Sequence, residues 1–301
     1  MIPHVVSCPV DWIESHRAPA EQVFLRAPGD GCEPDRLAAL LARWRSATRI
    51  RRLELPFTSE LDAVLQAVGP GLRVVVEVDR SSAAELHGEQ VRRWEAQVNL
   101  WAAPRITSRQ GILEAVTRAS LAGWPVQLPA VPGLLRGGDL LLELLEHYLF
   151  EPALDVPVEP LHSLLVCLVQ RQRRTLWNLW FGVPEDHFYL TDEGHVSLCE
   201  AWAGKAATRY GTADEEVSAW RSSAAYQGLL QDRRDFPRAQ TPCAECPARR
   251  PCAGVLLALD PALDCGPWQE LFERLRLAAG SLQRRNRERN RAAQPRPRPP
   301  G

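Results

Sequence analysis

The sequence contains almost no lysine, and this scarcity excludes several kinds of active site. Of its 36 lysine and arginine residues, Lys205 alone is a lysine. A Schiff-base lysine and a G-x-x-x-x-G-K-[ST] phosphate-binding loop are therefore not expected. The G-x-G-x-x-G, G-x-S-x-G and H-E-x-x-H patterns are missing too, which leaves no common motif for dinucleotide binding, serine hydrolysis or zinc proteolysis.

The chain also lacks a dominant charge and long apolar runs. The formal net charge is −1, so no overall field favours nucleic acid or a membrane surface as a partner. No apolar run approaches the roughly 20 residues of a membrane-spanning helix. Residues 1–20 have no apolar stretch after a basic start, so we expect no secretory signal and a reducing, cytoplasmic location.

Cysteines, by contrast, gather in one short stretch of the chain. The segment Thr241–Trp268 contains four of the eight, at Cys243, Cys246, Cys252 and Cys265. Their spacing is C-x2-C-x5-C followed by a later cysteine, and the first pair can direct two sulfurs from a single turn toward one metal centre. Thiolates are soft ligands, so this pattern predicts an iron–sulfur cluster or a zinc ion.

Three interpretations of these cysteines compete. Disulfides are disfavoured in a reducing compartment. Structural zinc usually takes two C-x2-C pairs, whereas this segment has one pair and two single cysteines. We therefore favour a [4Fe–4S] cluster and keep zinc as the alternative. Pro242, Pro247 and Pro251 stiffen the loop, which reduces the chain entropy lost on metal binding.

The first two thirds of the sequence alternates between strand and helix patterns. With 301 residues, of which 45% are apolar, the chain can bury a large core. Six strand–helix units predict parallel strands joined by helices. Because a closed barrel of this type has eight such units, we expect a partial barrel or an open sheet. The predicted strands cover residues 22–26, 52–56, 72–78, 98–102, 126–131 and 155–159. Helix-start signals follow at Asp35, Ser59, Ser81 and Thr107.

After Gly182 the pattern changes. Phe188–Leu190 and His195–Cys199 flank a turn of Asp, Glu and Gly, which predicts a β-hairpin. Helical periodicity follows at residues 215–230 and again at Gln269–Ala279. The cysteine segment lies between these two helices.

The remaining cysteine and histidine residues have simpler interpretations. Cys167 lies in a predicted helix from Leu161 to Trp180, where a buried, inert thiol is expected. His187 and His195 flank the hairpin, and we interpret them as exposed polar residues.

These patterns divide the chain into four parts. Residues 1–20 are expected to be an irregular segment, and residues 21–182 a partial (β/α)6 barrel domain. Residues 183–280 would form a small cysteine domain of a hairpin and helices. Residues 281–301, rich in Arg and Pro, are expected to be disordered.

This arrangement resembles the radical SAM enzymes that carry a SPASM or twitch extension. The resemblance spans about residues 21–275 and is most specific in DEGHVSLC at 192–199 and CAECPARRPCAG at 243–254. The stretch at 107–131 also reads like the fourth helix and fifth strand of the family. The resemblance implies a radical SAM-type partial barrel followed by a SPASM-like iron–sulfur domain.

The catalytic motifs of that family are missing. The family holds its catalytic cluster with C-x3-C-x2-C after the first strand, where this chain has RAPGDGCEP and only Cys32. The Gly-Gly-Glu segment that receives the amino group of S-adenosylmethionine is replaced by PFTSEL at 56–61. The resemblance therefore implies a degenerate member, which we do not expect to bind S-adenosylmethionine.

One auxiliary cluster of the family is matched. Cys243, Cys246, Cys252 and Cys265 correspond one by one to its four ligands. The second auxiliary cluster is incomplete, because Cys199 fits one position while Leu256 occupies another. Cys199 remains an alternative fourth ligand of the matched cluster.

Together these features predict an iron–sulfur pseudoenzyme without its own radical chemistry. It would act as a binding or maturation partner in peptide modification, with a peptide substrate or an intact radical SAM enzyme as partner. The alternatives are a radical SAM-type enzyme with a non-standard S-adenosylmethionine site and a zinc-stabilised structural protein. Neither nucleic acid nor a membrane is an expected partner.

Overall fold

The computed structural model shows a mixed α/β protein built on one sheet. It describes residues 5–9, 22–26, 34–45, 49–56, 61–68, 72–78, 99–104, 109–128, 130, 132–151, 156–181, 187–236 and 243–293. Within these residues the sheet has ten strands in the order β10-β9-β8-β1-β2-β3-β4-β5-β6-β7.

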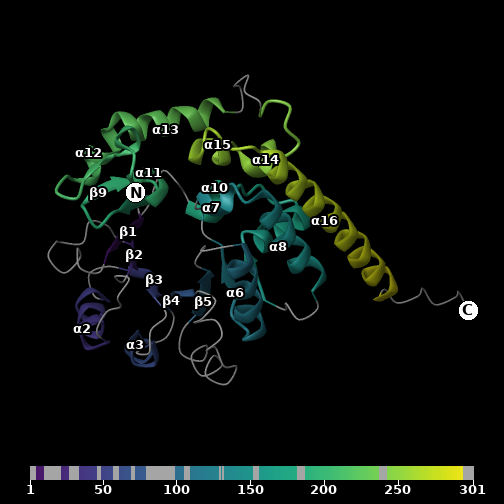
Figure 1. The fold of residues 1–301 in the computed structure, drawn as a ribbon, viewed down its shortest axis with the longest axis horizontal. Coiled ribbons are helices and arrows are strands. Elements are labelled where there is room, and N and C mark those ends of the chain that lie inside the picture. The colour runs from purple at the N-terminus through teal and green to yellow at the C-terminus, as the bar shows by residue number, and fades with distance from the viewer. Residues whose placement is uncertain are drawn as a thin grey trace, which may run out of the picture.

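Seven parallel strands follow one another in sequence order, as they do in a barrel. The last strand, β7, does not close onto β1, because β1 pairs with β2 on one side and with β8 on the other. This open arrangement confirms the predicted α/β class with a partial barrel (Figure 1). The strands are β1 Val5–Pro9, β2 Gln22–Arg26, β3 Arg49–Pro56, β4 Arg73–Val78, β5 Asn99–Pro104, β6 Val126–Gln127 and β7 Val158–Glu159.

Strand β1 corrects one prediction. Residues 1–20 were expected to be irregular, yet Val5–Pro9 is a strand in register with all five residues of β2. The apolar part of this run is only Val5 and Val6, too short to give a period of its own. Its position between β2 and β8 stabilises the strand through backbone hydrogen bonds, a tertiary effect that local sequence does not show.

Helices cover the outer face of the sheet, where alternate strand residues are fully buried. Leu25, Leu53 and Val74 are inaccessible to solvent, and α2, α3 and α6 lie along this side of β2–β5 (Figure 1). These helices and those that follow are α2 Pro34–Arg45, α3 Leu61–Val68, α6 Arg109–Leu121, α7 Pro132–Leu135, α8 Gly138–Phe150, α9 Leu161–Gln170 and α10 Leu176–Phe181. The helix expected from Ser81 lies outside the described residues.

Two predicted helices are each broken into two. The helix expected at 161–180 ends at Gln170, where Arg171 adopts a left-handed conformation with φ 57°. The helix expected at 215–230 is interrupted at Ser223, whose extended backbone and hydroxyl cap the next helix by accepting a hydrogen bond from the Tyr226 N–H at 3.2 Å. The result is α12 Val217–Ser222 followed by α13 Ala224–Asp235. Side-chain capping competes with helix continuation and is hard to read from periodicity alone.

The hairpin after the barrel is confirmed. β8 His187–Leu190 and β9 His195–Ser197 pair antiparallel, and Gly194 provides the turn with φ +82°. A short antiparallel strand, β10 Gly211–Thr212, completes the sheet. Because β8 is parallel to β1, the sheet continues across the expected boundary between residues 182 and 183. Between β9 and β10 lie α11 Glu200–Ala203 and a 3-10 turn, η2 Ala206–Thr208.

The last helix, α16 Gly266–Ala293, is longer than expected and corrects the prediction of a disordered tail from residue 281. Its second half is held by contacts with α9: the Gln283 side-chain amide donates to the carbonyl oxygens of Val169 at 2.7 Å and Leu168 at 3.2 Å. Arginine is also a good helix former, and after Pro267 no proline interrupts the sequence before residue 295. No helix in the described part of the chain, α16 included, is long and apolar enough to cross a membrane.

Candidate metal centre

The cysteine segment folds as two consecutive tight turns followed by two short helices. The N–H of Cys246 donates to the Cys243 carbonyl at 3.2 Å, and the N–H of Arg249 donates to the Cys246 carbonyl at 3.0 Å. The helices α14 Arg249–Cys252 and α15 Val255–Leu259 follow. This compact winding brings the C-x2-C pair and Cys252 to one side of the segment.

All four clustered cysteines line a single cavity of about 50 Å³. Cys243, Cys246 and Cys252 come from the turns, whereas Cys265 precedes the first turn of α16. Aromatic side chains complete the wall, namely Phe236, Trp268 and Phe272. The fold therefore places around one cavity the four cysteines that the sequence pattern predicts as metal ligands.

The thiols influence one another electrostatically. Burial, with smaller contributions from the neighbouring Cys265 and Cys243, raises the pKa of Cys252 to about 11. Burial also raises the pKa of Cys265, with added contributions from Cys243 and Cys246. Four thiolates in this space would repel one another, so their deprotonation requires a positive centre between them.

The thiols surround a space instead of meeting at one point. Across the described ranges, no group of three or more His, Cys, Asp or Glu side chains has the arrangement that holds a single metal ion. Nor is any of the six cysteines described at the side-chain level in a disulfide.

Backbone N–H groups are directed at one of the four sulfurs. Those of Leu256 and Gly254 lower the pKa of Cys252 and so partly offset the effect of burial on it. They reach the sulfur because the chain turns back through two consecutive left-handed residues, Ala253 with φ 50° and Gly254 with φ 78°. Successive backbone N–H groups turned toward one point form anion-binding concavities of the kind found at iron–sulfur sites.

Gly254 has no room for a side chain, which gives a first prediction. An added Cβ would overlap the ring of Phe236, and the left-handed backbone is unfavourable for any other residue. Gly254→Ala should destabilise the protein by about 1–3 kcal/mol and lower the iron content after reconstitution. Thermal unfolding and iron analysis measure the two effects.

Gly228→Ala is the matched control. Gly228 lies in α13 with no atom within 4 Å of an added Cβ. Alanine there should leave iron content unchanged and raise stability by up to about 1 kcal/mol. Equal behaviour of the two variants would contradict the role given to Gly254.

Side-chain hydrogen bonds hold the cysteine segment in place, and the sequence analysis predicted none of them. The indole N–H of Trp177 in α10 donates to the Ala253 carbonyl at 3.0 Å. The guanidinium of Arg249 donates to the carbonyl oxygens of Ala244 and Phe236 at 3.1 and 3.4 Å. The indole of Trp268 donates to the Leu135 carbonyl at 3.0 Å. The two tryptophan contacts join residues far apart in the chain, so no local sequence pattern predicts them.

An ion pair also joins the cysteine segment to the barrel side of the protein. Arg136 donates to the carboxylate of Asp260 at 2.5 Å, although Asp260 is only 6% exposed. This hydrogen bond lowers the pKa of Asp260. The pair links the turn after α7 to the end of α15.

The other cysteines lie elsewhere or outside the described residues. Cys199 is buried at the N-terminus of α11 and does not line the cavity. Cys167 is buried in α9, and burial raises its pKa. Cys32 lies outside the described residues, as do positions 57–60 of the PFTSEL stretch, and Cys8 is described only as part of β1.

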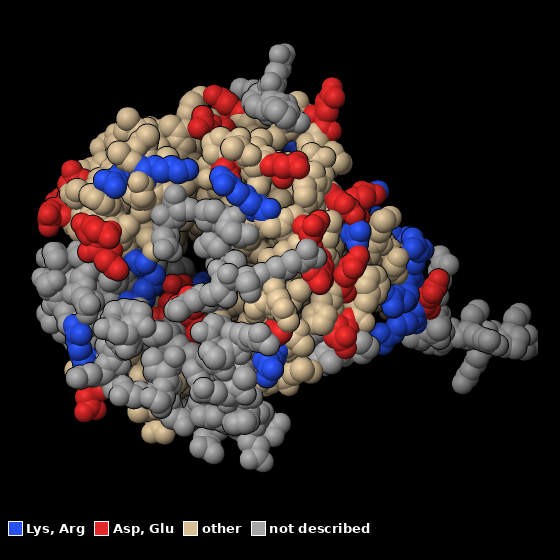
Figure 2. Space-filling view, in the orientation of Figure 1, with Lys and Arg blue, Asp and Glu red and all other residues tan. Residues whose placement is uncertain are grey.

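A second polar region, unexpected from the sequence, lies on the inner face of the sheet. Strand pairing places Arg26 beside Glu54, and Arg52 beside Arg73, on the face opposite the buried leucines. Arg52 forms an ion pair with Glu54 at 2.8 Å. In the space-filling view, charged side chains of both signs line the hollow on this face of the molecule (Figure 2).

Two of these arginines are held by aromatic rings and neutral acceptors. Arg73 lies 4.0 Å from the centre of the Trp101 ring and donates to the Gln127 side-chain oxygen at 2.8 Å. Burial, followed by the charge of Arg52, lowers its pKa to about 10. Arg26 lies 4.0 Å from the centre of the Tyr189 ring and donates to its hydroxyl.

His187 belongs to the same interior and corrects an expectation. It was interpreted as exposed, but it is 8% exposed in β8 and contacts the ring of Phe181. Burial, and then the charge of Arg52, lowers its pKa from 6.5 to about 4. The interpretation was wrong because β8 joins the main sheet beside β1 instead of standing free.

The lowered pKa of His187 gives a second prediction. The folded state disfavours the protonated imidazole, so this stability is fully present above pH 6.5 and is lost as the pH falls toward 4. Between pH 7 and pH 5, His187 should account for a loss of about 2 kcal/mol in the free energy of unfolding. Urea titrations at both pH values measure it. His187→Gln should remove most of this loss, whereas His195→Gln should retain it; identical pH dependence in both variants would contradict the assignment.

Comparison with known proteins identifies the fold of this chain through solved structures. No protein-family model and no curated protein sequence matches the chain. Solved structures of anSMEcpe, an anaerobic sulfatase-maturating radical SAM enzyme of SPASM type, do match. The histidine-tagged enzyme with bound AdoMet aligns with TM-score 0.56 and 13% identity over 89% of this chain and 87% of that one. The native enzyme with AdoMet and the Kp18Cys peptide aligns with TM-score 0.54 and 12% identity, over 92% and 99%.

A third structure, native anSMEcpe with AdoMet and the Cp18Cys peptide, aligns with TM-score 0.53 and 14% identity over 87% of each chain. At these identities the likeness establishes a radical-SAM-like fold. It does not carry over the chemistry of the enzyme.

Proposed function

We propose that this chain is an iron–sulfur protein with a radical-SAM-like fold and no radical chemistry of its own. The observation that carries the proposal is the convergence of Cys243, Cys246, Cys252 and Cys265 on one cavity. A [4Fe–4S] cluster bound there would supply one-electron transfer and a covalent link between the cysteine segment and α16. The barrel expected at residues 21–182 would also include β1, and the cluster domain expected at residues 183–280 would extend to the end of α16.

The residues present fit such a cluster. Four thiols are the donor set that a [4Fe–4S] centre takes, and here they ring a cavity. The N–H groups directed at Cys252 would stabilise its thiolate charge. Phe236, Trp268 and Phe272 limit the access of water, which also sets the potential of such centres. With all four positions held by protein thiolates, no iron would remain open for S-adenosylmethionine.

We further propose that the protein acts by binding, in a peptide-modification system. Two of the matched structures contain a bound peptide, which supports a peptide, or an intact radical SAM enzyme that acts on one, as the partner. The family holds its catalytic cluster in the loop after the first strand; residues 10–21, which follow β1, contain no cysteine, and the stretch between β2 and α2 contains only Cys32. A chain that keeps the fold without that motif is suited to recognition.

A direct assay of radical chemistry gives a third prediction. Protein reconstituted anaerobically, then incubated with dithionite and S-adenosylmethionine, should release no 5′-deoxyadenosine above a protein-free blank. An active radical SAM enzyme treated identically is the positive control. Turnover that survives Cys243→Ala but is lost in Cys32→Ala would contradict the proposal, because it would place a working cluster beside Cys32, between β2 and α2.

A further inference from the structure

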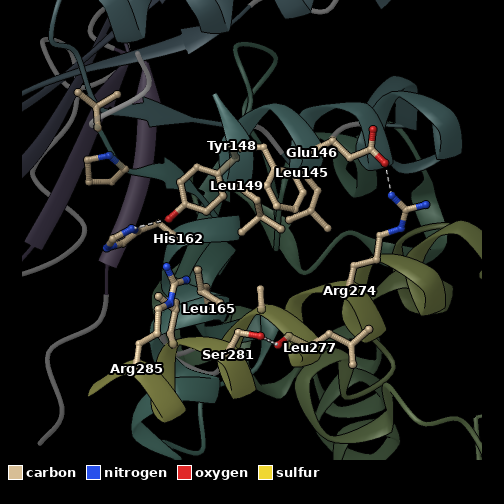
Figure 3. Close-up of a pocket in the computed structure, with 15 residues that line it drawn as sticks. Leu145, Glu146, Tyr148, Leu149, His162, Leu165, Arg274, Leu277, Ser281 and Arg285 are labelled. Atoms are coloured by element: carbon tan, nitrogen blue, oxygen red, sulfur yellow. Dashed lines mark hydrogen bonds and ion pairs between the residues drawn. The ribbon is translucent and has the colours of Figure 1, made fainter. Parts of the chain in front are cut away.

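A large apolar groove lies on the surface away from the cysteine cavity, between α8, α9 and α16 (Figure 3). Its volume is about 750 Å³, within the range of about 300–1,000 Å³ that is usual for ligand pockets. Leu145 and Leu149 come from α8, Leu165 from α9, and Leu277 and Leu282 from α16.

Exposed apolar side chains are concentrated at this groove. Of the described residues, three large hydrophobic side chains are exposed: Leu121, Phe150 and Leu277. Phe150 and Leu277, at 76% and 59% exposure, both line the groove. Exposed apolar surface that gathers around a concavity marks an interaction site more strongly than scattered residues do.

The lining of the groove includes one polar pair, Tyr148 and His162, which are hydrogen-bonded to each other. The Tyr148 hydroxyl and the Nδ1 atom of His162 lie 2.8 Å apart, with their rings edge to face. Burial, and the charge of Glu159, raises the pKa of Tyr148 to about 12, so its hydroxyl stays protonated. The surrounding helices are fixed, because Gln283 bonds to the end of α9 and Arg274 pairs with Glu146 of α8.

The end of the groove formed by the last turns of α16 is positively charged, whereas at the opposite end Glu146 of α8 pairs with Arg274 (Figure 3). Residues 281–293 of α16 contain five arginines and a single acidic residue, Glu288. Arg285 lines the groove and forms no ion pair with a carboxylate in the described part of the chain. Earlier in the same helix, Arg274 and Arg276 each have glutamate partners. The arginines of α16 are visible at the right edge of Figure 2.

We propose that this groove binds an acidic, amphipathic peptide segment of a partner, with bulky apolar residues inserted between α8 and α16 and carboxylates facing the arginines of α16. Helix-in-groove recognition has this form: apolar anchors at three- and four-residue spacing, flanked by complementary charge. This inference makes the proposed binding role more specific. It rests on that role only because it assumes that the partner is a peptide.

Other occupants fit the charges less well. The sequence after Ala293 contains two arginines and no acidic residue, so it would be repelled by the basic end of α16. A second copy paired through this face would place the same basic surface, Arg285 included, on both sides of the contact. A membrane surface would satisfy the charge, but a concave groove suits protruding side chains better than a flat lipid interface.

Fluorescence anisotropy with labelled 16-residue peptides tests the proposal on the full-length, cluster-loaded protein. Three peptides would be compared: an acidic one with leucines at helical spacing, a basic one with the same leucines, and an acidic one with the leucines dispersed. We expect the first to bind at least tenfold more tightly than the other two, and its binding to weaken as salt rises.

Two variants and one matched control locate the site. Leu277→Asp should weaken binding of the acidic amphipathic peptide at least tenfold. Leu121→Asp should leave binding unchanged, because Leu121 is equally exposed but ends α6 and does not line the groove. A triple change of Arg284, Arg285 and Arg287 to Glu should reverse the preference toward the basic peptide. Circular dichroism confirms that each variant is folded.

Each remaining outcome overturns the inference. If the acidic peptide binds but Leu277→Asp has no effect, the proposed binding role survives and the groove is the wrong site. If no peptide binds, the peptide partner of the proposed function fails as well. Sedimentation with anionic phosphatidylglycerol vesicles that is lost in Leu277→Asp, without peptide binding, would identify a membrane face. A dimer on gel filtration that Leu277→Asp dissociates would identify a second copy as the occupant.

Discussion

Replacing Cys265 with serine should reduce the iron bound after anaerobic reconstitution from about four atoms per chain to less than about one. Cys265 is the only one of the four thiols that comes from outside the turns of residues 243–252, and it lies at the start of α16. Its loss would leave the cluster with three thiolates and would break the link between the cysteine segment and that helix. Iron and sulfide analysis, together with the absorbance near 400 nm, measures the effect.

Cys167→Ser and Cys199→Ser are the matched controls. Both cysteines are buried, as Cys252 is, but neither lines the cavity. Both variants should retain about four irons per chain. If Cys199→Ser loses the cluster and Cys265→Ser keeps it, the fourth ligand is Cys199 and the assignment from the cavity is wrong.

Removal of the metal should make the cysteine segment sensitive to protease while the barrel stays resistant. The segment has few internal apolar contacts before Val255, so metal binding supplies much of its folding energy. Trypsin should cut the Arg249–Arg250 bond at least tenfold faster after oxidation and chelation, because Arg249 would lose its carbonyl partners in the turns.

The turn between α9 and α10 provides an internal control. Arg171, Arg173 and Arg174 are exposed there, and they belong to the barrel side of the protein. Cleavage at these sites should have the same rate with and without metal. Mass spectrometry of timed digests gives both rates, and an equal rate at Arg249 in the two states would refute the coupling of metal and fold.

The barrel was predictable because its signals are local. Short apolar runs followed by helical spacing located six of the seven parallel strands, β2 to β7, and the hairpin was marked by its Asp-Glu-Gly turn. Strand β1 was missed because Val5–Pro9 has too few apolar residues to show a period. The end of α16 was missed because its polar arginines resemble a solvated tail, whereas its order depends on contacts with α9.

The candidate site was predictable in its ligands and not in its surroundings. Cysteine spacing alone selected the four residues that the fold gathers around one cavity. The hydrogen bond from Trp177 to Ala253 and the ion pair of Arg136 with Asp260 join positions distant in sequence. The buried arginines of the barrel interior were overlooked for another reason: alternation in β3 and β4 shows which residues share a face, but not that this face is enclosed.

The most direct test of the central claim is the metal and sulfide content of the full-length protein purified without oxygen. The account predicts about four iron atoms and four sulfides per chain, with no second cluster, and a Mössbauer spectrum of the [4Fe–4S] type. Stoichiometric zinc without iron after anaerobic reconstitution would contradict it and would leave the zinc-stabilised structural protein as the correct interpretation.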